Sequence, residues 1–302
     1  MIIPAYLKKG DTIGITCPAG YMAAEKAQTG IETLQEWGYQ VMVGKTLGST
    51  STNYFSGTDQ ERADELQAML DDPTINAILF GRGGYGMGRI LPMLNFKRFK
   101  KNPKWLIGFS DITVIHTHLF SNFKIASMHA PMAAAFNDGG AGNEYIGSLK
   151  KALKGNKMNY STAPHPFNKP GSATGKLIGG NLALLAHVVG TPYDYATKNC
   201  ILFIEDIGEQ LYCTDRMLRQ LKAAGKMDKI SGLIFGGFTD MKDTDRPFGK
   251  TIDEILQEIS ADLNIPVCLH FPVSHGTENV ALKIGITCNL IVGAKKVTLK
   301  EL

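Results

Sequence analysis

Short apolar runs alternate with segments of helical periodicity through the first half of the chain. Apolar runs such as Trp105–Phe109 are bounded by glycine or polar residues, which is typical of buried strands. Segments such as Asp59–Leu70 repeat apolar residues every three or four positions, which predicts helices. The expected strands are Thr12–Cys17, Tyr39–Val43, Asn76–Phe80, Trp105–Phe109 and Lys124–His129, and the expected helices are Ala23–Trp37, Asp59–Leu70, Gly86–Leu94 and Asp111–Phe120.

This alternation of strands and helices with short connections predicts an α/β fold with an open, mostly parallel sheet. The segment 156–174 is rich in Pro, Ser, Thr and Asn and has no periodicity, so it is interpreted as a linker. The expected organisation is an N-terminal domain over 1–155 and a C-terminal domain over 175–302. In the latter, strands are expected at Ile201–Ile204, Ser231–Gly236 and Pro266–Phe271, helices at Thr214–Ala224 and Ile252–Leu263, and a closing hairpin at Ala281–Leu290 and Lys296–Leu299.

Composition and charge indicate a folded globular protein and do not identify a binding partner. Hydrophobic residues make up 44% of the 302 residues and charged residues 20%, as in folded globular chains. The net charge of +4 comes without a basic run, which indicates neither a nucleic-acid surface nor a membrane patch. Five widely spaced cysteines without a CxxC pair argue against disulfides and a cysteine zinc site. The N-terminus has no charged region before an apolar stretch, and no run of 18 apolar residues occurs, so a cytoplasmic protein is expected.

A serine stands where one expected strand meets the next helix. Ser110 follows the apolar run Trp105–Phe109 directly. A hydroxyl at such a turn can be a nucleophile, because the helix N-terminus behind it supplies free N–H groups and a positive dipole end. The segment has Ile112 where the G-x-S-x-G pattern has its second glycine. On composition alone, the interpretation of Ser110 as the N-cap of the following helix is favoured over that of a nucleophile.

A glycine-rich turn follows the expected strand Asn76–Phe80. Gly81, Gly83 and Gly86 match the G-x-G-x-x-G pattern of dinucleotide-binding turns. In that use the turn follows the first strand, and an acid comes about 20 residues later, whereas here the turn follows the third expected strand. A glycine N–H can instead donate to an oxyanion, or the loop can be a plain tight turn. The residues alone leave these three uses open.

A carboxylate and a histidine complete the candidate chemistry. Glu205 is expected at the end of an apolar strand, and His275 lies in a turn after another strand. The order Ser, Glu, His is also that of α/β-hydrolases. A solvated strand end and a surface histidine are the alternative interpretations. Of the other histidines, His165 falls in the expected linker and His270 in an apolar segment, where an interior residue is expected.

Seven segments occur in an order that is specific when taken together. They are Leu7–Ile13, Gly81–Gly86, Gly108–Thr113, Gly175–Leu182, Gly190–Tyr193, Phe203–Asp206 and Ser274–Asn279. With these segments the chain resembles, over nearly its whole length, the L,D-carboxypeptidase family of serine peptidases. That family includes muramoyltetrapeptide carboxypeptidases and microcin C self-immunity peptidases.

The resemblance implies a catalytic triad of Ser110 as nucleophile, Glu205 as acid and His275 as base. It also implies an oxyanion hole made by the backbone N–H of Asp111 and of Gly83 or Gly84. The implied fold is a Rossmann-like N-terminal domain with a second, smaller β-rich α/β domain. Family members commonly form homodimers and need no cofactor or metal, so activity is expected to survive a chelator.

The implied activity is that of a serine carboxypeptidase that hydrolyses an L,D-peptide bond. Its expected partner is a small muropeptide, the murein tetrapeptide, from which the terminal D-Ala is released. Arg82, beside the glycine loop, is the candidate for gripping the free carboxylate. Cleavage of a microcin C-type peptide antibiotic is the first alternative activity. The second alternative is that the protein is a dinucleotide-binding oxidoreductase. Ser274 and Lys283 depart from the Gly and Pro that are common at these positions in the family, which leaves substrate preference open.

Overall fold

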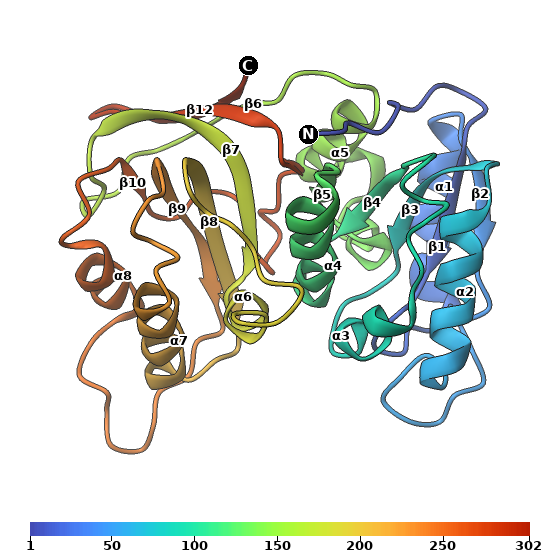
Figure 1. Ribbon diagram of the computed structural model, residues 1–302, viewed down its shortest axis with the longest axis horizontal. Coiled ribbons are helices and arrows are strands. Elements are labelled where there is room, and N and C mark those ends of the chain that lie inside the picture. Colours follow the sequence, from blue (N-terminus) through green and yellow to red (C-terminus); the bar gives the residue numbers. More distant parts are fainter. The chain divides into compact units, whose positions relative to one another are not determined.

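Two separate β-sheets organise the chain, and each belongs to its own compact unit. The computed structural model describes residues 1–302 (Figure 1). The first unit comprises Met1–Asn156 and Val280–Lys283, and the second comprises Lys157–Asn279 and Ile284–Leu302. The backbone therefore passes between the units three times.

The first unit is built on a six-stranded sheet with the order β11-β5-β4-β3-β1-β2. Neighbours among β1 to β5 pair in parallel. Strand β3 has the sequence INAILF and is buried at five of its six positions, as expected for a parallel strand covered on both faces. The strands are β1 Thr12–Thr16, β2 Gln40–Val43, β3 Ile75–Phe80, β4 Trp105–Gly108, β5 Ser127–His129 and β11 Leu282–Ile284.

Helices of very different length connect these strands. The longest, α2, begins with a capping box in which Thr58 and Glu61 exchange hydrogen bonds. Helix α5 is capped by Asn143, whose side chain accepts from two backbone N–H groups. The helices are α1 Gln28–Glu36, α2 Asp59–Asp71, α3 Met87–Ile90, α4 Thr113–His118 and α5 Glu144–Leu153.

The second unit holds a seven-stranded mixed sheet with the order β10-β9-β8-β7-β12-β13-β6. Strand β7 divides it: residues 176–181 pair in parallel with β8, and residues 171–176 pair antiparallel with β12. The curved ribbon of β7 is visible in Figure 1. The elements are β6 Asn159–Thr162, β7 Gly171–Asn181, α6 Leu182–His187, β8 Cys200–Ile207, α7 Leu211–Ala223, β9 Gly232–Thr239, α8 Ile252–Ser260, β10 Val267–Cys268, β12 Thr287–Val292 and β13 Val297–Glu301.

The segment 156–174 differs from the expected linker. It contains β6 and the first residues of β7, and so it contributes to the second sheet. Strand β6 lies at the edge of that sheet, with alternate residues exposed. Edge strands favour polar residues because one side faces water, and this explains a composition that resembles a linker.

The expected closing hairpin is split between the two sheets. Strands β12 and β13 pair antiparallel as predicted, but β11 joins the sheet of the first unit. Gly285, with φ of 88°, ends β11 before β12 begins. The helix expected over Gly86–Leu94 is likewise shortened to α3 and a 3₁₀ turn that has Pro92 at its start. None of the helices is long and apolar enough to span a membrane.

Candidate active site

Ser110 lies in a strained turn at the carboxyl end of β4. Its φ is 62°, one of five positive values at residues other than glycine. L-residues avoid this region because Cβ approaches the backbone, and they keep it where the surrounding structure imposes it. A 3₁₀ turn over Ser110–Ile112 follows and leads into α4. Its N-cap is Phe109 and receives no side-chain cap, so the structure contradicts the role of Ser110 as a helix cap.

Gly83 is the residue of the glycine loop that packs against this turn. A methyl group on Gly83 would lie 2.8 Å from Ser110 Cβ, 3.0 Å from Ser110 Oγ and 3.4 Å from Asp111 N. A methyl group on Gly84 would instead meet the hydroxyl of Tyr54 at 2.8 Å. The absence of a side chain at position 83 is therefore what lets the loop backbone approach the serine.

The side chain of Asp111 ties the same loop to the serine turn. Its Oδ2 accepts a 2.7 Å hydrogen bond from the N–H of Met87, the first residue of α3. Burial raises the pKa of Asp111 to about 6, although the hydrogen bond from Met87 and the charge of Arg62 oppose that shift. The carboxyl group thus connects the end of the glycine loop with the residue after Ser110.

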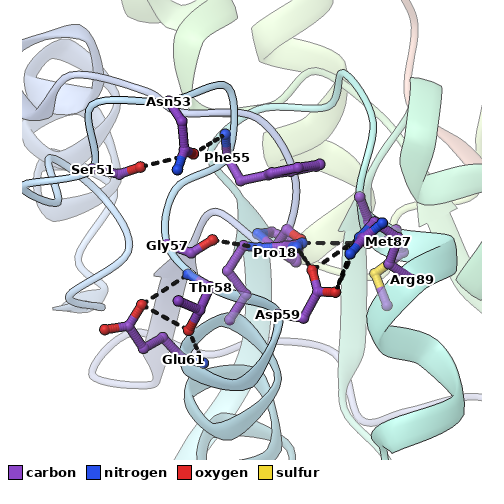
Figure 2. A network of polar contacts seen from close by, with 12 residues as sticks. Pro18, Ser51, Asn53, Phe55, Gly57, Thr58, Asp59, Glu61, Met87 and Arg89 are labelled. Carbon is purple, nitrogen blue, oxygen red and sulfur yellow. Dashed lines mark hydrogen bonds and ion pairs between the residues drawn. The ribbon is translucent and has the colours of Figure 1, made fainter.

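A buried arginine holds three loops of the first unit around this turn. Arg62 of α2 has no exposed surface and donates to the carbonyls of Pro18, Gly57 (3.2 Å) and Gly86 (3.3 Å). Asp59 pairs with it and also with the exposed Arg89. Figure 2 shows Asp59 facing Arg89, with Pro18 and Gly57 nearby.

Arg82 is exposed at the start of the glycine loop. One guanidinium nitrogen, Nη1, donates to the carbonyl of Tyr21 at 2.9 Å. A guanidinium has five N–H donors, so this contact uses only a small part of its capacity.

Glu205 and His275 form a direct pair in the second unit. Glu205 is fully buried at the sixth position of β8, inside the strand rather than at its end. Its Oε2 lies 2.6 Å from His275 Nδ1, and the imidazole is 11% exposed. This bond defines the orientation of the ring, and it leaves Nε2 as the atom available for proton transfer when Nδ1 carries the proton.

The charge of Glu205 governs the protonation of His275. Burial lowers the pKa of His275, but the hydrogen bond and the charge of Glu205, together with the charge of Asp206, outweigh burial and raise it above the ordinary value. Asp206 itself has its pKa raised to about 7, first by burial and further by the charge of Glu205. Its oxygens accept from Asn181 Nδ2 at 2.6 Å and from the N–H of Ala183 at 3.2 Å.

The two departures from the family pattern have structural roles. Ser274 shapes the turn that carries His275: its Oγ donates to the carbonyl of Glu278 at 2.9 Å and accepts from the N–H of Gly276 at 3.0 Å. Lys283 belongs to the first unit, where its Nζ donates to the carbonyl of Asn156 at 2.9 Å. Lys283 is 1% exposed.

The sequence-predicted residues thus fall into two groups. Ser110, Asp111 and Gly83 lie together in the first unit, and Glu205 and His275 lie together in the second. Sequence reasoning missed Arg62, although a signal existed. Arg62 occupies the buried stripe of α2 formed by Ala63, Leu66, Met69 and Leu70, where an arginine is out of place unless it is bonded.

A cavity of about 1140 Å³ lies elsewhere in the first unit. It is lined by residues between Met42 and Ile75, and it contains none of the predicted site residues. This cavity therefore does not coincide with the predicted site.

Two α/β units, one with a serine in a strained strand-to-helix turn and one with a histidine bonded to a buried carboxylate, contain the components of a serine hydrolase. Residues 13–130 match the LD-carboxypeptidase N-terminal domain, and residues 174–290 match the LD-carboxypeptidase C-terminal domain. The chain belongs to the LD-carboxypeptidase family and is a serine-type carboxypeptidase.

Individual relatives match almost end to end. The probable murein peptide carboxypeptidase of Bacillus subtilis (strain 168) is 34% identical over 287 residues, which is 93% of this chain and 89% of the relative. The microcin C7 self-immunity protein MccF of Escherichia coli is 27% identical, covering 99% of this chain and 96% of that protein. The crystal structure of muramoyltetrapeptide carboxypeptidase from Oxalobacter formigenes superimposes with a TM-score of 0.87 at 29% identity, over 96% of this chain and 98% of that one.

Proposed function

We propose that this carboxypeptidase removes the terminal D-Ala from murein tetrapeptides. The names of the Bacillus subtilis and Oxalobacter formigenes relatives support a murein peptide as substrate. The bond cut joins the L-centre of the diamino acid to D-Ala. The bond between the buried Glu205 and the half-buried His275, at 2.6 Å, is the observation that carries the chemistry.

In the proposed mechanism, Ser110 is the nucleophile. Neutral His275 takes the Ser110 proton at Nε2, and Oγ bonds to the carbonyl carbon. Glu205 stabilises the imidazolium that results. The tetrahedral intermediate then expels the D-Ala amine, which receives the proton from His275, and water releases the shortened peptide from the serine by the same steps. The serine and the histidine come from different units, so this mechanism requires the units to bring Ser110 within hydrogen-bonding reach of His275.

The backbone N–H groups of Asp111 and Gly83 are proposed as the oxyanion hole. Support comes from the close approach of the Gly83 backbone to Ser110 and Asp111 N. Such donors stabilise charge that develops in the transition state, and the loss of one costs roughly 10²- to 10³-fold in rate. Gly84, the other candidate, lies against Tyr54 and is the weaker choice.

Arg82 is proposed to bind the free carboxylate of the substrate. It is exposed, and only Nη1 is engaged, by the carbonyl of Tyr21. The remaining N–H groups can donate to the two oxygens of a carboxylate in a bidentate pair.

The decisive experiment offers purified protein L-Ala-γ-D-Glu-diaminopimelate-D-Ala and measures free D-alanine. Release is expected from the wild type and not from Ser110→Ala. A folded wild-type protein that releases no D-alanine would contradict the murein assignment. The likeness to MccF supports one second candidate, a peptide antibiotic of the microcin C type, and processed microcin C would then be the substrate cut in parallel assays.

The triad proposal can be tested with any peptide that the protein cleaves, whether or not it is the natural substrate. Ser110→Ala and His275→Ala are each expected to lower kcat by roughly 10⁴-fold or more, and the double variant no further, because triad residues act as one unit. If the double variant loses as much kcat as the two single variants combined, the two residues act separately, and they do not belong to one triad.

We also propose a cytoplasmic homodimer. All five cysteines are free thiols, which suits a reducing compartment, and the dimer follows from the family resemblance. Light scattering of the purified protein tests whether it is a dimer, because a monomeric mass at working concentration would contradict the proposed homodimer.

A further inference from the structure

We infer a binding site for a divalent transition metal in the second unit, formed by His165, Asp253 and His270. The three residues come from separate elements. His165 lies between β6 and β7, Asp253 in the first turn of α8, and His270 just after β10. Their potential ligand atoms all lie within 4.8 Å of one another.

Asp253 joins the two imidazoles. Its Oδ1 lies 2.9 Å from His270 Nε2, and its Oδ2 lies 3.4 Å from His165 Nε2. The two rings are tilted at 47° to each other, with centroids 4.8 Å apart. His270 has a φ of 56°, so its backbone adopts a conformation that residues other than glycine rarely take while its ring meets Asp253.

The segment that carries His165 is held in place by other bonds. Lys169 Nζ donates to the carbonyls of Ser260, Ala261 and Leu263, at and just beyond the carboxyl end of α8. Asn168 Oδ1 accepts from the N–H of Leu269, the residue before His270. The backbones that carry the two histidines are therefore fixed near each other without a metal, and pre-organisation lowers the entropic cost of binding an ion.

The site is open to solvent and can contract around an ion. The side chains of His165, Asp253 and His270 are 23%, 27% and 53% exposed. Tetrahedral zinc with bonds of roughly 2.0–2.2 Å separates its ligand atoms by about 3.4 Å, so the widest gap of 4.8 Å must close by about 1.4 Å. Side-chain rotation can supply such a movement where the residues are exposed.

The donor set defines the class of metal. Two imidazole nitrogens and one carboxylate oxygen suit Zn²⁺, Co²⁺ or Ni²⁺ rather than Mg²⁺ or Ca²⁺, which prefer oxygen ligands. Both rings must be neutral and free at Nε2, so each keeps its one proton at Nδ1. His165 then gives up the 3.3 Å hydrogen bond that its Nδ1 accepts from Phe167.

A metal here would restrain the segment that leads to the catalytic histidine. His270 lies five residues before His275, and a metal bond would connect it to α8 and to the segment before β7. The site is therefore a structural clip at the base of the His275 loop, and it does not take part in the hydrolytic step.

The test titrates ZnCl₂ into tag-free, chelator-free protein by calorimetry, with CoCl₂ absorption as a second readout of imidazole ligation. The wild type is expected to bind one ion, and His165→Gln and His270→Gln to weaken binding by more than roughly tenfold. His187→Gln, which removes another exposed histidine, is the control and should bind like the wild type. With Zn²⁺, hydrogen exchange over residues 269–279 should slow in the wild type and in His187→Gln, but not in His165→Gln or His270→Gln.

Two outcomes would overturn the site. One is a wild-type protein that binds no Zn²⁺ and no Co²⁺. The other is a double variant, His165→Gln with His270→Gln, that melts at the wild-type temperature without metal and still binds the ion as tightly as the wild type does.

Discussion

Ser110 carries backbone strain at the position proposed for the nucleophile. A left-handed conformation costs an L-residue roughly 1–2 kcal/mol. No capping hydrogen bond from the Ser110 side chain offsets this cost, because the N-cap of the 3₁₀ turn is Phe109. Strain of this kind persists at functional sites, where a sharp turn presents a side chain that a regular strand or helix would hide.

Ser110→Gly is expected to be more stable than Ser110→Ala by about 1 kcal/mol, because glycine adopts a φ of 62° without strain. Both variants should be inactive. Urea denaturation measures the difference. At Ser172, whose φ is not positive, the same pair of substitutions should give the opposite order. Equal stabilities at position 110 would show that the turn is not strained.

Glu205→Gln is expected to shift the acidic limb of the kcat/KM profile to lower pH. The wild-type limb should lie above the ordinary histidine value near 6.5, because Glu205 raises the pKa of His275 and the neutral ring is the base. Glutamine removes that charge while burial still favours the neutral ring, and the rate should fall by roughly 10⁴-fold. Glu144→Gln, on the exposed start of α5, is the control.

The same pair links stability to pH in a defined direction. The pKa of His275 is raised in the folded state, so the folded chain holds that proton more tightly than the unfolded chain. The contribution of the pair to the free energy of unfolding is fully present below pH 6.5 and is lost as the pH rises through the folded-state pKa.

If the acidic limb of the kcat/KM profile does not move in Glu205→Gln, then Glu205 does not control the pKa of the catalytic base.

At the scale of elements, the strained turn depends on the loops that surround it. The glycine loop reaches Ser110 through Gly83, Asp111 fastens the start of α3, and Arg62 of α2 fastens three loops at once. Because Arg62 is completely buried, its four partners, three backbone carbonyls and the carboxylate of Asp59, replace the water it has lost. Helix α2 thus supports the site although it supplies none of the reacting groups.

Gly83→Ala is expected to lower kcat by roughly 10²-fold, because the new methyl group would lie 2.8 Å from Ser110 Cβ and displace the turn or the loop. Gly147→Ala is the matched control. Position 147 is helical and has open space around it, so alanine there should stabilise α5 by up to about 1 kcal/mol and leave activity unchanged. Full activity in Gly83→Ala would show that this loop does not form part of the oxyanion hole.

At the scale of the whole molecule, the chain does not divide into two consecutive pieces. Residues 280–283 belong to the first unit although residues 157–279 before them in the sequence belong to the second, and β11 lies beside β5 at the edge of the first sheet. The N–H of Ala281 also donates to Ser148 Oγ, and Lys283 donates to the carbonyl of Asn156. The carboxyl-terminal part of the sequence therefore completes the amino-terminal unit.

A protease site inserted between the exposed Asn156 and Lys157 should leave the two fragments associated after cleavage. Strand β11 of the second fragment remains part of the first fragment's sheet, and its bonds hold the pieces together. Size-exclusion chromatography measures this association. Separation of the fragments under native conditions would show that β11 adds little to the first unit.

Several features were accessible from residue patterns. The strands β1 to β5 follow from apolar runs, and Ser110 at the end of β4 follows from a strand that meets a helix. Other features were not. Glu205 lies inside a strand that continues two residues further, and the segment expected as a linker forms β6 and part of β7. His270 was expected in the interior, yet it is 53% exposed beside His165 and Asp253.

The sequence by itself determined the class of the fold, the family and the chemical types of the candidate residues, because apolar periodicity and short motifs are local properties of the chain. Only the tertiary structure decided the left-handed φ of Ser110, the approach of Gly83, the bond from Glu205 to His275 and the meeting of His165 with His270. These depend on contacts between residues many positions apart, and their geometry is determined by packing that no local pattern records.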